Sequence, residues 1–157
     1  MEFIRHIEGT YGDITIELGR SAAGNLEDCR AAVVIPFLNG RLLMTYHPAR
    51  AGWEFPGGTR EQGETVEECA LRETLEETGA AVRNLQPLGF YRVSRDGKIL
   101  TKTALYTAEA AGLAEKPGWS ETGEVVAFET LPENISFKDD VYKIVLEYLR
   151  EGRYYSE

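Results

Sequence analysis

Two turns that each end in glycine constrain this chain more than any other feature of its sequence. Asn39-Gly40 and Asp96-Gly97 both separate segments that are rich in apolar and β-branched residues. The four flanking segments are Ala31–Leu38, Leu42–Met44, Leu88–Ser94 and Lys98–Thr107. A tight type I′ turn needs positive φ at both central residues, which Asn, Asp and Gly tolerate best. We therefore expect two antiparallel hairpins, which argue against a doubly wound parallel sheet.

Two segments have the pattern of helices. The first is expected at Val66–Thr78, because Thr65 and Glu68 form a capping-box pair and Gly79 suits a C-terminal cap. The second is expected to begin near Ser136, with Asp139 as its box partner. Its apolar stripe has helical spacing and consists of Val141, Ile144, Val145, Tyr148 and Leu149. Further strands are expected at Asp13–Leu18 and Glu124–Phe128, so the pattern predicts a mixed sheet with helices on its faces.

Length, charge and cysteine content exclude several classes of protein. The 157 residues predict one domain over residues 1–157, and 17 Lys and Arg against 26 Asp and Glu give a net charge of −9. Such a chain lacks the basic face that duplex nucleic acid needs. The longest apolar run, Ala31–Leu38, is too short for a membrane span of about 20 residues, and residues 1–10 do not resemble a secretory signal. Cys29 and Cys69 form no CxxC motif, so we expect reduced thiols and a cytoplasmic protein.

The first predicted helix carries a cluster of carboxylates. Glu73, Glu76 and Glu77 are spaced i, i+3, i+4 and share one helix face, where Arg72 alone cannot neutralise them. A solvated acidic surface would explain such a face. A site for a hard divalent cation would explain it too, because closely spaced carboxylates suit Mg²⁺ or Mn²⁺. The paired glycines Gly57-Gly58 favour the metal site, since they let the backbone approach another group closely.

The residues around this cluster resemble a known motif, the Nudix box G-x₅-E-x₇-R-E-U-x-E-E-x-G-U, where U is a bulky aliphatic residue. The matching positions within residues 58–80 are Gly58, Glu64, Arg72, Glu73, Glu76, Glu77 and Gly79. Thr74 and Ala80 depart from the two U positions, which concern packing of the helix on the sheet. The flanking segments Trp53–Gly58 and Leu131–Asn134 are similar to those of the MutT-like nucleoside triphosphate pyrophosphohydrolases of this family.

The resemblance implies a fold, a reaction and a metal. The implied fold is a Nudix-type α/β/α sandwich with a mixed sheet and two main helices. The implied reaction is hydrolysis of a nucleoside diphosphate linked to another group, X. Mg²⁺, for which Mn²⁺ can substitute, is expected to bind the carboxylates of Glu73, Glu76 and Glu77 and the carbonyl of Gly57.

Other residues are expected to assist this reaction. The resemblance implies that Arg72 orients the catalytic glutamates and that Glu64 holds the loop and helix together. A further glutamate from outside the box often joins such sites. Glu121 is our first choice and Glu124 the alternative, and a solvated loop position would explain Glu121 equally well.

Four residues are expected to bind substrate. In MutT-like proteins a purine lies near the residues that match Phe55 and Asn134, and we assign His47 and Gly58 to the same function. His47 stands where the MutT enzyme has an arginine used in base recognition. Phe55 could instead be a core aromatic, Asn134 a helix-entry cap and His47 a polar surface residue.

The predicted substrate is a nucleoside triphosphate or a modified purine deoxynucleoside triphosphate similar to 8-oxo-dGTP, cleaved to monophosphate and pyrophosphate by a monomer or homodimer. One alternative is an RNA 5′-pyrophosphohydrolase. Another is a non-catalytic nucleotide-sensing module, although such modules typically lose glutamates of the box. Four cations near the second hairpin could contact a triphosphate or an RNA 5′ end, or could be solvated strand-edge charges: Arg92, Arg95, Lys98 and Lys102.

Overall fold

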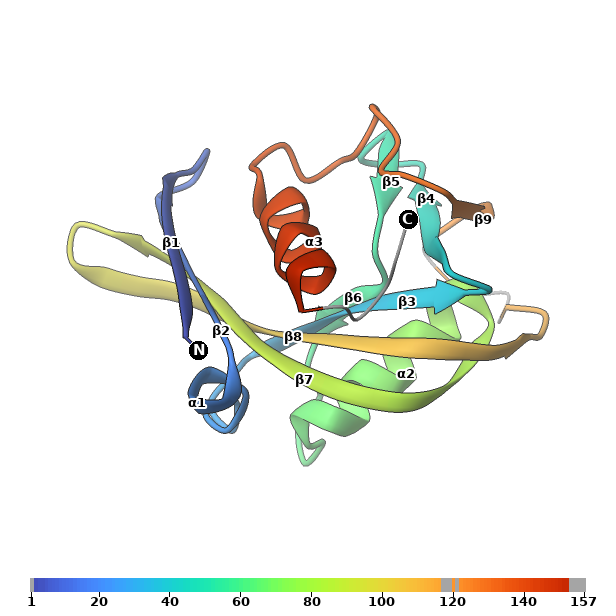
Figure 1. Ribbon diagram of the computed structural model, residues 1–157, viewed down its shortest axis with the longest axis horizontal. Coiled ribbons are helices and arrows are strands. Elements are labelled where there is room, and N and C mark those ends of the chain that lie inside the picture. The colour runs from blue at the N-terminus through green and yellow to red at the C-terminus, as the bar shows by residue number, and fades with distance from the viewer. Residues whose placement is uncertain (1, 117–119, 121, 153–157) are drawn as a thin grey trace.

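The computed structural model describes residues 2–116, 120 and 122–152 of the chain. In this part, one mixed sheet lies between helices, as the sequence predicts (Figure 1). Figure 1 shows α2 on one side of the long β7–β8 hairpin and α3 on the other. The elements are β1 (Phe3–Glu8), β2 (Asp13–Leu18), α1 (Arg20–Ala23), β3 (Ala31–Leu38), β4 (Arg41–His47), β5 (Gly52–Glu54), β6 (Gly57–Thr59), α2 (Val66–Thr78), β7 (Ala80–Arg95), β8 (Lys98–Leu113), β9 (Val125–Phe128) and α3 (Val141–Glu151).

The sheet has the order β1-β2-β7-β8-β3-β4-β5, with β6 paired to β3 and β9 paired to β4. Only the β3–β8 pair is parallel among the strand pairs of the described residues. Both predicted hairpins form, with φ of 51° and 78° at Asn39 and Gly40 and 53° and 77° at Asp96 and Gly97. The positive φ values explain why Asn, Asp and Gly stand at these turns.

The sheet has a separate apolar core on each face. On one face, the inward side chains of β2 and β4 pack against the apolar stripe of α3, which includes the fully buried Val145 and Leu149. On the other face, β3 and β8 pack against α1 and α2, where Cys69 and Ala70 are buried. The small side chains of α2 bring this helix close to the sheet. The acidic face of α2 is thereby placed beside β6.

Both ends of α2 form as the sequence predicts. Glu68 N donates to Thr65 Oγ1 (3.0 Å) and Thr65 N donates to Glu68 Oε1 (2.9 Å), which completes the capping box. Gly79 has φ 75° and its N–H donates to the carbonyl of Leu75. Thr74 stands at a position where the box usually has an aliphatic residue, and its buried hydroxyl donates to the carbonyl of Ala70 (2.8 Å). This bond satisfies the Thr74 hydroxyl, which would otherwise be buried without a hydrogen-bond partner.

The second helix begins later than the sequence predicts. Helix α3 starts at Val141, and its N-cap Asp140 makes no side-chain capping bond. The expected capping pair has other partners: the Ser136 hydroxyl donates to Glu54, and Asp139 accepts hydrogen bonds from Thr10. The segment before the helix is irregular instead, and its residue Ile135 forms an isolated parallel bridge with Trp53 of β5. Tertiary bonds therefore replace the predicted first turn of this helix.

Several elements are absent from our predictions. β1, α1, β5 and β6 are short or weakly patterned, and β7 and β8 extend beyond the predicted segments to Ala80 and Leu113. The extensions pair through β-bulges, which interrupt the regular alternation of side chains that a strand prediction needs. Within the described residues, the helices are too short and too polar to cross a membrane.

Candidate functional site

The acidic face of α2 lies directly against the glycine pair of β6. The carboxylate of Glu73 is so close to Gly58 that a Cβ placed there would lie 2.5 Å from its Cδ. At Gly57 a Cβ would lie 2.5 Å from the carbonyl oxygen of Ala32 on β3. Neither position can carry a side chain without displacing its neighbours. The glycine pair therefore brings backbone and carboxylate into contact, as the sequence suggests.

Arg72 joins the acidic side chains of this region. Its Nε and Nη2 donate to the two carboxylate oxygens of Glu64 (2.6 and 2.9 Å), a bidentate pair. Its Nη1 donates to Glu73 (2.8 Å) and Glu76 (3.4 Å). Nη2 also donates to the carbonyl of Thr59 in β6 (3.2 Å). One guanidinium thus fixes the loop and two of the three predicted metal-binding carboxylates.

The network changes the acidity of its members. The hydrogen bonds from Arg72 lower the pKa of Glu64 to about 2, and the same carboxylates raise the pKa of Arg72. Glu64 also accepts a hydrogen bond from Glu61 N (3.0 Å), which closes the loop before α2. Glu64 therefore remains charged and holds the loop, in agreement with its expected position.

Glu77 lies deeper than the other two carboxylates. Its Oε1 accepts a hydrogen bond from the backbone N–H of Gly57 (2.7 Å), and its side chain is buried. Burial raises its pKa to about 8, with the charge of Glu73 adding to the effect. Burial also raises the pKa of Glu73, against the opposing effect of Arg72. Two desolvated carboxylates beside each other are electrostatically unfavourable unless a cation or a proton compensates them.

The donor set of this site fits a hard divalent cation in its chemistry. Three carboxylates and the Gly57 backbone offer only oxygen ligands, which Mg²⁺ and Mn²⁺ prefer. In the described residues, no group of three His, Cys, Asp or Glu side chains already converges as a metal-binding cluster. Glu73 and Glu76 are bonded to Arg72 instead, and Glu77 to Gly57 N. The carboxylates are therefore gathered at one place without being arranged around one point.

A pocket of about 410 Å³ opens beside the glycine pair. Gly57, Gly58 and Thr59 form one wall, and Ala31, Ala32 and Val33 of β3 line its apolar part. The other lining residues come from the turn after β1, from β5 and the residues that flank it, from β7 and β8, and from the segment before α3 and its first turn: Thr10, Tyr11, Arg50, Glu54, Phe55, Tyr91, Thr103, Ser136, Phe137, Lys138, Asp139 and Tyr142. No residue of α2 lines the pocket, but the Glu73 carboxylate of that helix lies against Gly58 in the glycine wall.

The structure brings only part of the predicted substrate site to this pocket. Phe55 and Gly58 line it, although Phe55 is buried and its ring packs edge-on against Tyr142, with centroids 4.8 Å apart. Asn134 and His47 are not among its lining residues. Asn134 is exposed and accepts a hydrogen bond from Trp53 N through its backbone carbonyl (2.8 Å). His47 is buried, and its Nδ1 accepts from Arg50 N (3.2 Å) in the turn between β4 and β5.

An ion pair at the edge of the pocket was not predicted. Arg50 donates from Nε (2.6 Å) and Nη2 (3.1 Å) to the carboxylate of Glu54, which also accepts from the hydroxyl of Ser136. Glu54 is buried whereas the Arg50 side chain is 60% exposed. The bond from Ser136 joins β5 to the segment before α3. The spacing i, i+4 in a non-helical segment provides no signal from which a sequence reader would infer the pair.

Glu121 lies outside the described residues, so its predicted assistance at the site stays a prediction. Its neighbour Thr122 is buried, and the Thr122 hydroxyl donates to the backbone carbonyl of Glu77 (3.0 Å). Lys116 Nζ donates to Thr122 Oγ1 (2.9 Å) and to the carbonyl of Gly123. Glu124, the alternative, is exposed. The loop before β9 is thus anchored at the end of α2.

Two of the four predicted cations form ion pairs with acidic residues outside the pocket. Lys102 pairs with Asp28 (2.6 Å) and lies over the ring of Phe90, and Arg92 pairs with Glu17 (2.8 Å). None of the four cations lines the pocket beside the glycine pair.

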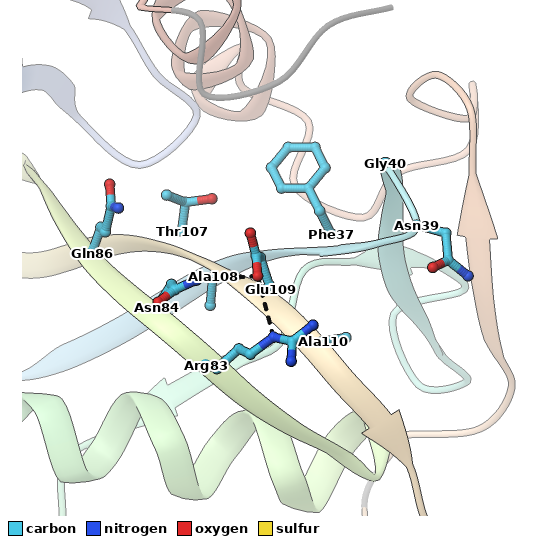
Figure 2. A pocket seen from close by; sticks show the side chains of 10 residues that line it. All are labelled: Phe37, Asn39, Gly40, Arg83, Asn84, Gln86, Thr107, Ala108, Glu109 and Ala110. Atoms are coloured by element: carbon cyan, nitrogen blue, oxygen red, sulfur yellow. Dashed lines mark hydrogen bonds and ion pairs between the residues drawn. The ribbon is translucent and has the colours of Figure 1, made fainter.

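A second hollow is lined by residues of β3, β7 and β8 and of the turn after β3, and none of the predicted site residues lines it (Figure 2). It has a volume of about 510 Å³. Glu109 accepts hydrogen bonds there from Arg83 Nε (3.3 Å) and Asn84 Nδ2 (3.1 Å). Its carboxylate is therefore already paired.

Comparison with known proteins agrees with the geometry. A model of the NUDIX domain matches residues 28–145. The chain is 42% identical over 127 residues to the putative 8-oxo-dGTP diphosphatase YtkD of Bacillus subtilis (strain 168), which covers 76% of this chain and 79% of YtkD. It is 29% identical over 87 residues to an RNA pyrophosphohydrolase of Baumannia cicadellinicola subsp. Homalodisca coagulata, over 55% of each chain.

Solved structures lead to the same family. The crystal structure of the Bacillus subtilis pyrophosphohydrolase BsRppH superposes with a TM-score of 0.82 and 34% identity, over 97% of this chain and 99% of that one. A MutT NUDIX hydrolase from Burkholderia pseudomallei shares the fold, with a TM-score of 0.60 and 23% identity over 76% and 96% of the two chains. The box residues gathered on α2, the matched domain and these relatives together show that this chain belongs to the Nudix hydrolase family.

Proposed function

We propose that this Nudix hydrolase cleaves a nucleoside triphosphate, in particular a modified purine deoxynucleoside triphosphate such as 8-oxo-dGTP, to monophosphate and pyrophosphate. The observation that carries the proposal is the pocket beside Gly57 and Gly58. Its apolar and aromatic walls suit a nucleobase, and its glycine wall adjoins the carboxylates that suit a metal-bound phosphate chain. The name of the relative YtkD, a putative 8-oxo-dGTP diphosphatase, supports the substrate class.

The carboxylates have distinct tasks in this proposal. Glu73, Glu76 and Glu77, with the Gly57 carbonyl, hold Mg²⁺, or Mn²⁺ in its place. A divalent cation supplies charge neutralisation at the phosphates and lowers the pKa of bound water. Arg72 keeps Glu73 and Glu76 in position through the bonds described above. A carboxylate of this group, or Glu121 from the neighbouring loop, accepts the proton of the attacking water.

The base binds among residues near β5 and β6. We assign Phe55 to the apolar floor of the base site and Gly58 to the wall nearest the phosphates, since both line the pocket. Asn134 and His47 remain candidates for contacts to the base. Both lie in segments adjacent to β5, and neither lines the pocket here.

The alternative substrate is the 5′-triphosphate end of RNA. One relative favours it by name, the RNA pyrophosphohydrolase of Baumannia cicadellinicola. The similar structure of BsRppH is named a pyrophosphohydrolase, which agrees with either substrate. The chemistry at the phosphates is the same for both substrates. Only the binding of the rest of the substrate differs between them.

A competition assay distinguishes the two substrates. Wild-type protein with Mg²⁺ is incubated with 8-oxo-dGTP, dGTP and a 5′-triphosphorylated RNA, and products are separated by chromatography. The proposal expects monophosphate and pyrophosphate from the free nucleotides, with the highest kcat/KM for one of them. Preferential cleavage of the RNA at equal concentration would favour the alternative. Absence of any phosphoanhydride cleavage, with Glu76→Gln protein as the inactive control, would overturn both.

The variant Asn134→Ala tests the contribution of this side chain to base choice. If the side chain contacts the base, its loss removes about 1–3 kcal/mol of the binding energy that kcat/KM reports for the best nucleotide. The ranking of the bases then changes. Turnover at saturation should hardly change, because such a contact is similar in the ground and transition states. If only the backbone of Asn134 matters, through its bond to Trp53, the ranking stays as in wild type.

We infer that residues 1–157 act as one Nudix domain, as monomer or homodimer. One sheet takes strands from Phe3 to Phe128, which supports the single domain. Cys29 and Cys69 are free and buried, which is compatible with the reducing cytoplasm.

A further inference from the structure

The N-terminal hairpin lies outside the part of the chain that the NUDIX model matches, yet it reaches the pocket. The match covers residues 28–145, whereas β1 and β2 span Phe3–Leu18 and pair along their full length. β2 also pairs with β7, so the hairpin is an extension of the central sheet. Its turn supplies Thr10 and Tyr11 to the lining of the pocket. In Figure 1 this turn lies beside the segment that leads into α3.

A group of hydrogen bonds, which we call the Thr10–Asp139 clasp, fastens the turn to that segment. Thr10 N lies 3.1 Å from both carboxylate oxygens of Asp139, and the Thr10 hydroxyl donates to Oδ1 (3.0 Å). The turn itself is tight, because Gly9 N donates to the carbonyl of Gly12 (2.9 Å). At Gly12, with φ 154°, a Cβ would lie 2.4 Å from the carbonyl oxygen of Ser94. The turn is therefore fixed by Asp139 on one side and packed against the Ser94 backbone on the other.

Tyr11 is the residue that this arrangement presents to the pocket. It follows the clasped Thr10, lines the pocket and is 75% exposed. The other aromatic residues of the lining are occupied by one another. Phe55 and Phe137 pack against Tyr142, with centroids 4.8 and 5.5 Å apart, and Tyr91 packs against Phe137 at 5.8 Å. Tyr11 thus offers an aromatic surface that the core does not use.

We propose that the β1–β2 turn is part of the substrate site and that Tyr11 stacks on the nucleobase of the bound nucleotide, positioned by the Thr10–Asp139 clasp. The inference rests on the proposed function for the kind of ligand and adds a contact from outside the part of the chain that the NUDIX model matches. A ring on the turn covers a base that enters between the sheet and the segment before α3. Stacking accepts any base, because every base has a π-face. Tyr11 therefore contributes affinity, and base selection is left to polar groups deeper in the pocket.

The first test measures binding without turnover. Nucleoside 5′-monophosphates of guanine, adenine, cytosine and uracil are titrated into wild type and Tyr11→Ala with Mg²⁺ present, and heat is recorded by calorimetry. We expect Tyr11→Ala to bind the best monophosphate about 5- to 150-fold more weakly, the range that loss of one base–aromatic stack produces. Tyr11→Phe keeps the ring and should bind within about twofold of wild type. The control Ile99→Ala removes a 60% exposed apolar side chain outside the pocket and should leave affinity unchanged.

The second test concerns the clasp. Asp139→Ala removes all acceptors for Thr10, so the turn is no longer fixed and binding should weaken although Tyr11 is intact. If the clasp acts through Tyr11, the double variant Tyr11→Ala/Asp139→Ala should be no weaker than the weaker single variant. The control variant Thr10→Ser keeps both the N–H and the hydroxyl that bond Asp139, so it should bind with wild-type affinity. Independent, multiplicative losses would show that Asp139 does not position Tyr11.

The outcomes separate this inference from the proposed function. If wild type binds monophosphates but cleaves no phosphoanhydride, the proposed function fails and the Tyr11 comparison still decides the inference. If wild type cleaves nucleotides and Tyr11→Ala binds and cleaves them as wild type does, the inference is overturned and the proposed function stands. Absence of any binding by wild type also overturns the inference. Thermal midpoints of all variants identify losses that come from unfolding.

Discussion

At the scale of single residues, Arg72 connects the loop before α2, helix α2 itself and strand β6. It is bonded at once to Glu64, Glu73 and Glu76 and to the carbonyl of Thr59, with only 22% of its side chain exposed. Its loss leaves several carboxylates close together without a cation. We expect Arg72→Ala to lower the free energy of unfolding by about 2–4 kcal/mol, between the values for surface and buried pairs. Urea denaturation measures this directly, and activity should fall as well.

The matched control for that prediction is Arg83→Ala. Arg83 pairs with Glu109 at 3.3 Å, but both side chains are more than half exposed. Such a pair contributes about 0–1 kcal/mol. If Arg72→Ala were no more destabilising than Arg83→Ala, the network around Arg72 would have no structural importance.

Glu77 should make the metal-free protein less stable as pH rises. Burial raises its pKa to about 8 from the ordinary value of 4.5 for a glutamate. Between these two values the folded state keeps a proton that the unfolded state has lost, so stability falls with increasing pH through this window. Glu77→Gln removes this charge and can still accept the hydrogen bond from Gly57 N. With chelator present, we expect its thermal midpoint to exceed that of wild type at pH 8 and the gap to shrink towards pH 5.

The control for this effect is Glu67→Gln, which makes the same change on the exposed side of α2. Its thermal midpoint should follow that of wild type across the pH range. A gap for Glu77→Gln that is independent of pH would contradict the assignment of the effect to the Glu77 carboxyl.

At the scale of elements, α2 has a side-chain cap at its N-terminal end whereas α3 does not. The capping box of Thr65 and Glu68 satisfies two N–H groups at the start of α2. We expect Thr65→Ala to lower the free energy of unfolding by about 1 kcal/mol. Hydrogen exchange of the Glu68 amide should accelerate in this variant. Asp140→Ala at the N-cap of α3, which makes no side-chain capping bond, should not accelerate exchange in the first turn of α3.

At the scale of the whole molecule, binding of a divalent metal ion should raise both the activity and the stability of the protein. The site gathers Glu73, Glu76 and Glu77 on one helix face, where Arg72 is bonded to the first two only, and a divalent cation would relieve their repulsion. We expect activity to vanish with chelator and to return with Mg²⁺ or Mn²⁺. Binding should also stabilise the fold, by about 2.7 kcal/mol at a metal concentration 100 times the Kd. Full activity in excess chelator, or a thermal midpoint indifferent to metal in wild type, would contradict the metal site.

The sequence by itself determined the elements whose signals are local. The turns at Asn39-Gly40 and Asp96-Gly97 require positive φ, and the capping box with Gly79 defines the ends of α2. The spacing of the box placed three glutamates on one face of that helix, because helical geometry alone decides which residues share a face. The family assignment rested on the same short-range pattern and is confirmed by the domain match.

Only the tertiary structure decided which distant segments meet. Ser136 and Asp139 look like a capping pair, yet they bind Glu54 and Thr10, which are far away in the chain. The pocket likewise takes Tyr11 from a turn far in sequence from the box on α2. Local patterns report the preferences of neighbouring residues, whereas such contacts depend on how the sheet orders its strands. A hydroxyl or carboxylate takes the partner that the fold places within reach, and the sequence does not state which one that is.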